Sequence, residues 1–325
     1  MENLIPDQAR LYYEMLRIRL IEEALAKKYI EQKMRCPMHL CIGQEAVPVG
    51  ISSALTEEDQ VFGNHRSHGY YLAKGGNLKA MIAEIYGKTT GCSGGRGGSM
   101  HLIDLKVGFL GCTSIVGGTI PLGLGAAMAA KMKGENRIIV AYFGDGCFEE
   151  GVLHESLNFA SLKGLPIIFV CENNRYSVYT NLQTRQPERP MHKVAEAHGW
   201  EVNSGDGNDL EYVAEIARKA VSRIKTNERP QFLEFETHRW VEHCGHEYDD
   251  HLNYRSEVEI KSWKNRCPIK QLETKLISNS TINSEDLNSY RNTITEEIKE
   301  SFKFAEASPY PSLGSLYEFS NIKPS

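Results

Sequence analysis

The chain has 325 residues, of which 24% are charged, and a formal net charge of −5 at pH 7. This length allows a sizeable core, and the charge gives no electrostatic reason to expect nucleic acid or an anionic membrane as a partner. No eighteen-residue apolar run occurs, and no basic stretch with an apolar core follows Met1, so we expect no membrane span, no secretory signal and a cytoplasmic protein.

The first half of the chain predicts mainly helices. Residues 7 to 31 repeat apolar side chains with a helical period, and three further helical segments follow at residues 45–56, 76–87 and 121–131. No Pro/Ser-rich linker or charge block divides the chain. We therefore expect a single domain over residues 1–325, with an N-terminal helix at about 7–31 and a C-terminal helical extension at about 265–325.

The middle of the chain predicts a β-α-β unit. Residues 137–143 and 166–171 are short apolar runs rich in β-branched side chains, and residues 151–163 between them have a helical pattern. Strands buried on both faces have this composition, and the connection makes them parallel. A strand and helix over 201–225 and a strand at 231–236 follow. The fold class expected is α/β, a doubly wound and mostly parallel sheet flanked by helices.

Polar clusters follow both apolar runs of this unit. Gly144-Asp145-Gly146 comes after the first run and Asn173-Asn174 after the second, so both fall at the carboxyl edge of the sheet, where open α/β folds bind ligands. A carboxylate and an amide oxygen suit Mg²⁺, and the glycines allow a phosphate to approach the backbone. Either cluster alone is explained as well by a tight turn, but their common edge favours a metal–diphosphate site.

Two other glycine-rich segments match no nucleotide motif. Gly123-Leu-Gly125 lacks the third small residue of a dinucleotide fingerprint, and Gly91 to Ser99 lacks the Gly-Lys-Ser/Thr ending of a P-loop. We interpret the first as close helix packing and the second as a flexible or anion-cradling loop. The eight cysteines form no Cys-x-x-Cys pair, which predicts reduced, mostly buried thiols without a catalytic role.

The central motifs resemble a known family. Gly-Asp-Gly-Cys-Phe-Glu-Glu-Gly (144–151) and Leu-Pro-Ile-Ile-Phe-Val-Cys-Glu-Asn-Asn-Arg-Tyr (165–176) are similar to the thiamine diphosphate motif of 2-oxo acid dehydrogenase α subunits. These subunits belong to the first, decarboxylating component of the pyruvate, branched-chain and acetoin dehydrogenase complexes. The resemblance covers about residues 8 to 275 and includes further blocks at 39–46, 65–69, 94–101 and 115–123.

The resemblance implies a cofactor site for thiamine diphosphate and Mg²⁺. The family's metal ligands correspond to Asp145, the Asn174 side chain and the Tyr176 carbonyl, and Arg66 corresponds to a residue that pairs with the diphosphate. The remaining cofactor contacts implied are His65, Ser114, Val116, Gly144, Gly146, Cys147 and His243. His65 stands where relatives often have tyrosine, and Ser114 where they often have glycine.

Histidines carry the catalytic roles that the resemblance implies. His39 corresponds to a histidine near the 2-oxo acid, His243 to one near the reactive thiazolium, and His68 to a residue that supports Arg66 or the fold. The loop after Arg239 is about two residues longer than in the pyruvate and branched-chain enzymes and has Cys244 where those enzymes often carry a phosphorylatable serine. His243 and His246 are both candidates for the loop histidine; the distance from Arg239 favours His243.

The family's chemistry requires a second chain. The glutamate that activates thiamine diphosphate belongs to a β subunit, and no equivalent domain is present in this sequence, so the resemblance implies a heterotetramer of two α and two β chains. The substrate implied is a 2-oxo acid or acetoin, with acyl transfer to the lipoyl arm of an acyltransferase component. Two alternatives stay open: a carboligase that passes the acyl group to another carbonyl without a lipoyl partner, and a non-catalytic scaffold subunit.

Overall fold

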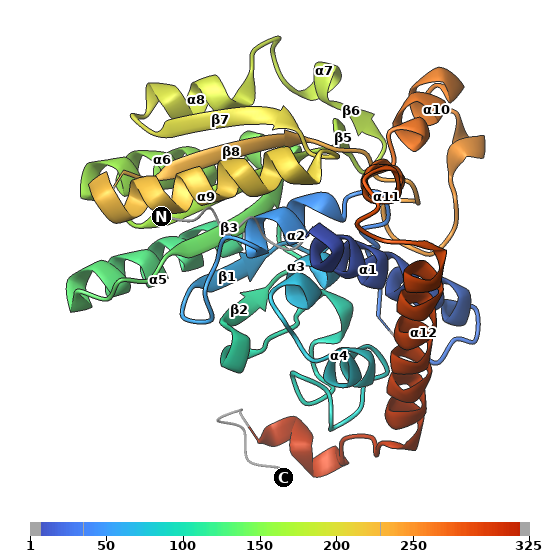
Figure 1. Cartoon of the computed structure of the whole chain (residues 1–325). Coiled ribbons are helices and arrows are strands. Elements are labelled where there is room, and N and C mark those ends of the chain that lie inside the picture. The colour runs from blue at the N-terminus through green and yellow to red at the C-terminus, as the bar shows by residue number, and fades with distance from the viewer. Residues whose placement is uncertain (1–7, 35, 228, 319–325) are drawn as a thin grey trace.

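A six-stranded parallel sheet forms the centre of the molecule (Figure 1). The computed structural model describes residues 8–34, 36–227 and 229–318. The strand order is β2-β1-β3-β4-β8-β7, and every neighbouring pair is parallel. The strands span Gln60–Gly63 (β1), Phe109–Cys112 (β2), Ile139–Gly144 (β3), Ile167–Asn173 (β4), Glu201–Asp206 (β7) and Gln231–Glu236 (β8); Tyr176–Ser177 (β5) and Thr180–Asn181 (β6) form a small hairpin. The predicted α/β class with a parallel sheet is confirmed.

Helices cover both faces of the sheet (Figure 1). The helices that lie between strands in the chain connect them, because parallel strands cannot be joined by tight turns. Their bounds are Gln8–Tyr29 (α1), Ala46–Ser52 (α2), His68–Ala73 (α3), Leu78–Ile85 (α4), Thr119–Lys133 (α5), Gly151–Lys163 (α6), Leu182–Arg185 (α7), Met191–Ala197 (α8), Leu210–Asn227 (α9), Glu257–Asn265 (α10), Pro268–Ser278 (α11) and Ser284–Ala307 (α12).

Side-chain alternation along the strands builds two cores. In β3, Ile139, Ala141 and Phe143 pack with α5, α6 and α8, while Val140 and Tyr142 point to the opposite face, against the cluster of α1, α2, α4 and α9. All five side chains are buried. The uninterrupted apolar run seen in the sequence is therefore the pattern of a strand covered on both faces.

Most predicted elements are confirmed near their expected bounds. α6 coincides with the predicted helix at 151–163, and α5 extends the predicted helix at 121–131 by two residues at each end. The predicted N-terminal helix corresponds to α1, although its residue 7 lies outside the described residues. α1 packs against α11 and α12 within the chain. The sequence pattern did not predict β1 and β2, which have four residues each and end in or contain glycine.

The strand order creates a switch point at the carboxyl edge. From β1 the chain crosses to β2 on one side, and from β3 it crosses to β4 on the other side. The loops after these neighbouring strands therefore diverge and leave a crevice between them, which is where open α/β sheets bind ligands. The residues directly after β1 are Asn64, His65 and Arg66, and those after β3 begin with Asp145.

The glycine-rich segment 91–99 wraps around a buried carboxylate. Glu84 of α4 is fully buried, and its two oxygens accept hydrogen bonds from the backbone N–H groups of Ser93, Gly95, Gly97 and Gly98 at 2.6 to 3.1 Å. The loop therefore does form an anion cradle, and the anion in it is a side chain of the protein. Glycines permit this path because Gly95 and Gly98 have positive φ angles.

Replacing Glu84 by glutamine is expected to destabilise the protein by about 2–4 kcal/mol. The side-chain NH₂ group of glutamine would replace one carboxylate oxygen, and it cannot accept the two backbone hydrogen bonds that this oxygen accepts. Chemical denaturation of the variant measures this loss. Glu58→Gln, at an exposed position, serves as the control and is expected to change the free energy of unfolding by less than about 0.5 kcal/mol. Equal stability of both variants would contradict the cradle.

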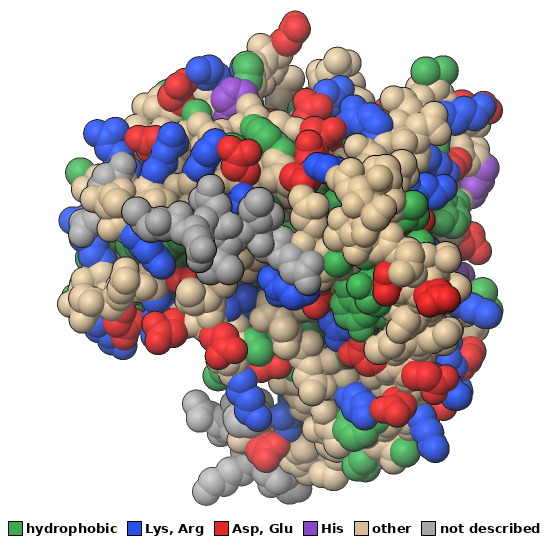
Figure 2. Space-filling model, viewed as in Figure 1, with side chains coloured by type: hydrophobic (Ala, Val, Ile, Leu, Met, Phe, Trp, Pro, Cys, Tyr) green, Lys and Arg blue, Asp and Glu red, His purple; other side chains and the backbone are tan. Residues whose placement is uncertain are grey.

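The surface carries charges of both signs. On the face shown in Figure 2, basic and acidic side chains alternate and neither gathers into a large patch. No helix among the described residues is long and apolar enough to cross a membrane. Five of the eight cysteines are buried, which confirms the prediction of mostly buried thiols; burial raises the pKa of Cys112 and of Cys147 to about 12.

Candidate functional site

A cleft of about 320 Å³ lies at the switch point of the sheet. All residues predicted to bind cofactor, metal or substrate line it, and His68, predicted as a support, does not. The lining includes His39, His65, Arg66, Ser114, Val116, Gly144, Asp145, Gly146, Cys147, Asn174, Tyr176 and His243. The fold thus brings together residues that lie up to 204 positions apart in the sequence (243 − 39).

Strand register places the two predicted metal-binding clusters side by side. Gly144, the last residue of β3, pairs with Glu172 of β4, so Asp145 and Asn174 emerge from neighbouring strands at almost the same level. The Asn174 side-chain oxygen accepts a hydrogen bond from the Tyr176 backbone N–H at 3.1 Å. This turn holds the amide and the backbone of residue 176 at the mouth of the cleft.

Backbone pairing brings the His243 loop to the segment that carries His39. The Trp240 N–H donates to the Ile42 carbonyl at 3.0 Å, and the Gly245 N–H donates to the Met38 carbonyl at 2.9 Å. His243 lies between these two contacts and faces the cleft. His246, the other candidate for the loop histidine, does not line the cleft and packs beside Tyr29, with ring centroids 5.4 Å apart. The geometry therefore favours His243.

Arg66 presents a buried positive charge to the cleft. Its guanidinium donates to two backbone carbonyls, those of Leu40 at 2.6 Å and His243 at 3.2 Å, and within the described part of the chain it makes no ion pair. The side chain is 4% exposed. Desolvation lowers the pKa of Arg66 to about 10, with Arg239 adding to the effect, and the remaining donors are suited to a phosphate group.

The Asp145 carboxylate is buried and forms an ion pair with Arg185. Arg185 of α7 donates to one carboxylate oxygen of Asp145, and the Gln186 amide donates to its backbone carbonyl at 3.1 Å. Burial raises the pKa of Asp145 even though Arg185 opposes the shift. A carboxylate so desolvated requires a positive partner, and a divalent cation with oxygen ligands from Asp145 and Asn174 fits this requirement.

The backbone around Asp145 leaves room for a phosphate. A Cβ atom built on Gly144 meets no atom closer than 3.9 Å, that of the Glu172 carbonyl, and one built on Gly146 meets the Ser177 hydroxyl at 3.3 Å. Glycine here keeps the cleft wall free of side chains rather than supplying a special backbone angle, because neither residue has positive φ. The residues present therefore fit a diphosphate with its metal ion.

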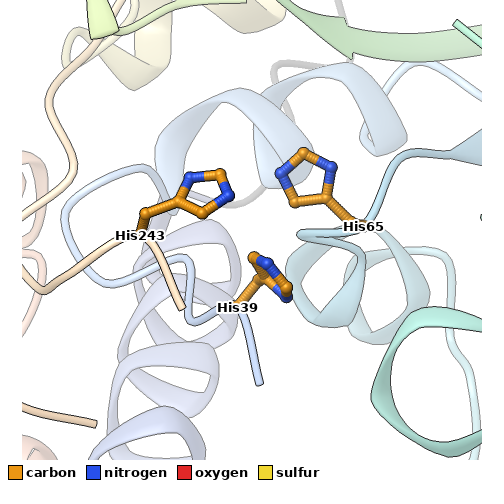
Figure 3. A group of neighbouring side chains, drawn as sticks. All are labelled: His39, His65 and His243. Atoms are coloured by element: carbon orange, nitrogen blue, oxygen red, sulfur yellow. The ribbon is translucent and has the colours of Figure 1, made fainter. Parts of the chain in front are cut away.

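Three histidines that line the cleft bring their rings together, as Figure 3 shows. The ring centroids of His39, His65 and His243 lie 4.7, 5.0 and 5.3 Å apart. Desolvation, reinforced by the charge of Arg66, lowers the pKa of His39 to about 2 and those of His65 and His243 to about 3. All three rings are therefore neutral near pH 7.

These depressed pKa values predict acid sensitivity. Between pH 3 and about 6.5 the unfolded chain binds a proton at His65 that the folded chain does not, so the free energy of unfolding falls as the pH falls. In His65→Tyr, the slope of stability against pH near pH 5 is expected to decrease by about 1.4 kcal/mol per pH unit. Denaturant titrations at pH 4.5, 5 and 5.5 measure the slope, and an unchanged slope would contradict a neutral His65 in the folded protein.

His68 lies behind the cleft rather than in it. Its two ring nitrogens contact the Glu22 carboxylate at 2.6 Å and the Ser99 hydroxyl at 2.7 Å, and the ring is fully buried. The other oxygen of Glu22 accepts the Cys41 backbone N–H at 2.6 Å. His68 thus connects α1 to the segments that carry His39 and the glycine-rich loop, a geometry that suits support rather than substrate contact.

Several residues that sequence reasoning did not select also line the cleft. Glu172 is buried and accepts a hydrogen bond from the Tyr70 hydroxyl, and its other carboxylate oxygen has no partner among the described residues; burial raises its pKa to about 7. The others are Pro37, Gln44, Asn64, Met100, Gly117, Ser177 and Val178. Glu172 adjoins Asn173 in the sequence, so its position directly before the polar cluster was an available signal. Arg185 had none.

A second hollow of about 630 Å³ lies near the ends of β4, β8 and β7. It is larger than the cleft at the switch point, but it contains none of the predicted site residues. Its wall mixes acidic and basic side chains, and Glu234 in it is already hydrogen-bonded to Asn173 and His192. The predicted cofactor-binding and metal-binding residues therefore lie in the smaller cleft.

Comparison with known proteins gives the same family as the motifs. The model of the family described as the dehydrogenase E1 component matches residues 13–313. The pyruvate dehydrogenase E1 component subunit alpha of Rickettsia felis is 35% identical over 306 residues, covering 94% of this chain and 93% of the relative. The protein of that name from Porphyra purpurea is 36% identical, with 95% and 91% covered.

A plant protein matches as well. The chloroplastic pyruvate dehydrogenase E1 component subunit alpha-3 of Arabidopsis thaliana is 36% identical over 314 residues, with 95% of this chain and 73% of the relative covered. The chain therefore belongs to the dehydrogenase E1 component family, as an α subunit of the thiamine diphosphate-dependent 2-oxo acid dehydrogenases.

Proposed function

We propose that this chain, paired with a β subunit, binds thiamine diphosphate with Mg²⁺ and decarboxylates a pyruvate-like 2-oxo acid, or cleaves acetoin, for acyl transfer to a lipoyl carrier. One observation carries the proposal: a single cleft at the switch point combines the buried charge of Arg66, bonded to two backbone carbonyls, with the oxygen ligands of Asp145 and Asn174. A diphosphate bridged to a divalent cation requires this combination of charges.

Each group in the cleft has a distinct role in this proposal. Asp145, Asn174 and the Tyr176 carbonyl hold the metal ion, and Arg66 neutralises the diphosphate. Ser114, Val116, Gly146 and Cys147 border the cofactor mainly through backbone atoms, and His65 donates to the diphosphate. When bound, thiamine diphosphate supplies the carbanion that attacks the substrate carbonyl and accepts its electrons.

Two histidines complete the proposed substrate site. The rings of His39 and His243 are 5.0 Å apart and neutral near pH 7, so each can donate or accept one hydrogen bond. We assign His39 to the 2-oxo acid side and His243 to the reacting centre, where a neutral imidazole moves a proton to or from a developing oxyanion. His68 keeps its supporting position behind them.

Reductive acylation of lipoyl domains tests the proposed function. The α chain co-produced with its β partner is expected to acylate at least one candidate lipoyl domain when supplied with cofactor, Mg²⁺ and a 2-oxo acid. Failure with all lipoyl domains, together with transfer of the acyl group to an added aldehyde or sugar, would favour the carboligase alternative, which the lengthened loop after Arg239 motivates. Absence of any turnover despite cofactor binding would favour the scaffold alternative.

The outer face of α5 is a candidate surface for contact with the proposed β subunit. This helix starts beside the cleft, and its solvent-facing stripe consists of Leu122, Gly125, Ala129 and Met132 rather than charged residues. Leu122 is 58% and Met132 76% exposed. A stripe of apolar and small residues lets another helix approach closely, so we place a subunit contact here.

Gly125→Glu tests this contact without disturbing the fold. A Cβ on Gly125 meets no atom within 4 Å, and replacing glycine in a helix interior favours the helix by up to about 1 kcal/mol. We therefore expect a stable chain that no longer co-purifies with its β partner, as measured by size-exclusion chromatography with light scattering. Asn292→Glu on the exposed face of α12 is the control and should assemble normally. Normal assembly of Gly125→Glu would remove α5 from the interface.

A further inference from the structure

We propose that His39, His65 and His243 form a binding site for a first-row transition-metal ion, such as Zn²⁺ or Co²⁺, on the floor of the cleft. One ring nitrogen from each histidine lies within 4.8 Å of the other two. The rings come from three separate segments, before α2, after β1 and after β8, and face a common space (Figure 3). Their convergence is a property of the fold rather than of one helix or loop.

The three histidine nitrogens need to move only slightly closer together to bind one ion. A tetrahedral ion with metal–nitrogen bonds of about 2.0–2.1 Å needs ligand nitrogens roughly 3.3 Å apart, so each ring must rotate inward by a fraction of its width. Nothing fixes the rings where they are: among the described residues no side-chain hydrogen bond involves any of the three, and the buried Nδ1 of His39 has no partner. An unpartnered nitrogen in a buried site gains most from a ligand.

The ligand set selects against Mg²⁺. Three neutral imidazoles with an open fourth position suit Zn²⁺, Co²⁺ and their neighbours in the transition series, whereas Mg²⁺ prefers oxygen ligands. The site is therefore chemically distinct from the oxygen site at Asp145. The positive charge of Arg66 opposes binding of a cation here, so all three histidines are needed to hold the ion. Loss of one is therefore expected to weaken metal binding at least about tenfold.

His65 is the decisive ligand of the three. A phenol is a far poorer ligand for these ions than an imidazole, so His65→Tyr would remove the third ligand. His39 and His243 alone would leave a two-coordinate site. The inference does not depend on cofactor chemistry, but an ion bound here would fill the floor of the cleft in which we place the diphosphate and the substrate.

Cobalt absorption spectroscopy tests the proposal on the full-length chain, purified with any subunit that accompanies it. Excess Mg²⁺ in the buffer keeps the oxygen site occupied, and no thiamine diphosphate is added. We expect one Co²⁺ per chain with the intense visible bands of a four-coordinate complex, lost in both His65→Tyr and His243→Gln and retained in His246→Gln, a histidine of the same loop outside the cluster. Wild-type protein without these bands, or bands that persist in either cluster variant, would overturn the proposal.

A structural measurement on the wild-type protein does not depend on whether the variants fold. Crystals of the wild-type protein soaked in Zn²⁺ should show an anomalous difference peak at the zinc edge between the three rings, and a peak elsewhere alone would also overturn the proposal. Inhibition of turnover by Zn²⁺ and its reversal by chelation form a separate arm that rests on the proposed function. If turnover is absent but cobalt binds as expected, the proposed function fails and the metal site stands.

Discussion

Replacing Asp145 by asparagine is expected to weaken Mg²⁺-dependent binding of thiamine diphosphate by at least about 100-fold and to abolish turnover with it. Asparagine keeps the shape of the side chain but removes the charge that a divalent cation requires in a buried site. In the structure this charge is balanced by Arg185, so the cation and the guanidinium compete for the same carboxylate. Isothermal titration calorimetry on the α chain with its β partner measures the effect.

Glu149→Gln is the matched control for Asp145→Asn. Glu149 follows Asp145 by four residues, also pairs with Arg185 and does not line the cleft. If the effect of Asp145→Asn arose only from release of Arg185 and α7, the Glu149 variant would reproduce part of it. We expect its cofactor affinity to stay within about threefold of the wild type. Cofactor binding that is indifferent to Asp145 would refute the proposed metal site.

The Asp145 and Asn174 side of the cleft was predictable from the strand pattern because parallel strands align their carboxyl ends. Asp145 and Asn174 follow two apolar runs that any α/β sheet would bury, and their proximity follows from the register of β3 and β4. Arg66 and His65 were selected through the family motif alone. The strand that carries them, β1, has only four residues, too few for a period-two or apolar pattern to distinguish it from a loop.

The contacts that shape the site from behind were not predictable. Glu84 in its cradle and Glu22 beneath His68 are acidic residues in helices, a composition normally found at the surface. Their burial depends on segments distant in the sequence, and no local pattern encodes such pairs. The same holds for Arg185, whose neighbours in the sequence form a short polar helix. The anion-cradling interpretation of residues 91–99 gave the chemistry of the loop but not the anion.

The two histidines of the loop after Arg239 provide the sharpest test of catalysis. His243→Gln is expected to lower kcat by about 10²–10⁴-fold, the usual contribution of a positioned acid–base group, and to lower the affinity for thiamine diphosphate by a much smaller factor. The structure gives the reason: His243 faces the cleft and lies 5.0 Å from His39, ring centroid to ring centroid. Steady-state kinetics and calorimetry on the same preparation separate the loss of kcat from a loss of cofactor.

His246→Gln is the control, because it lies three residues further along the same loop and contacts Tyr29 instead of the cleft. The loop is held at its base by buried Arg255, which donates to the Arg239 carbonyl and pairs with Asp249, so neither substitution should unfold it. We expect His246→Gln to retain kcat within about twofold. If His246→Gln lost kcat and His243→Gln kept it, the catalytic role would lie with His246, and the spacing from Arg239 would not determine which histidine reaches the substrate.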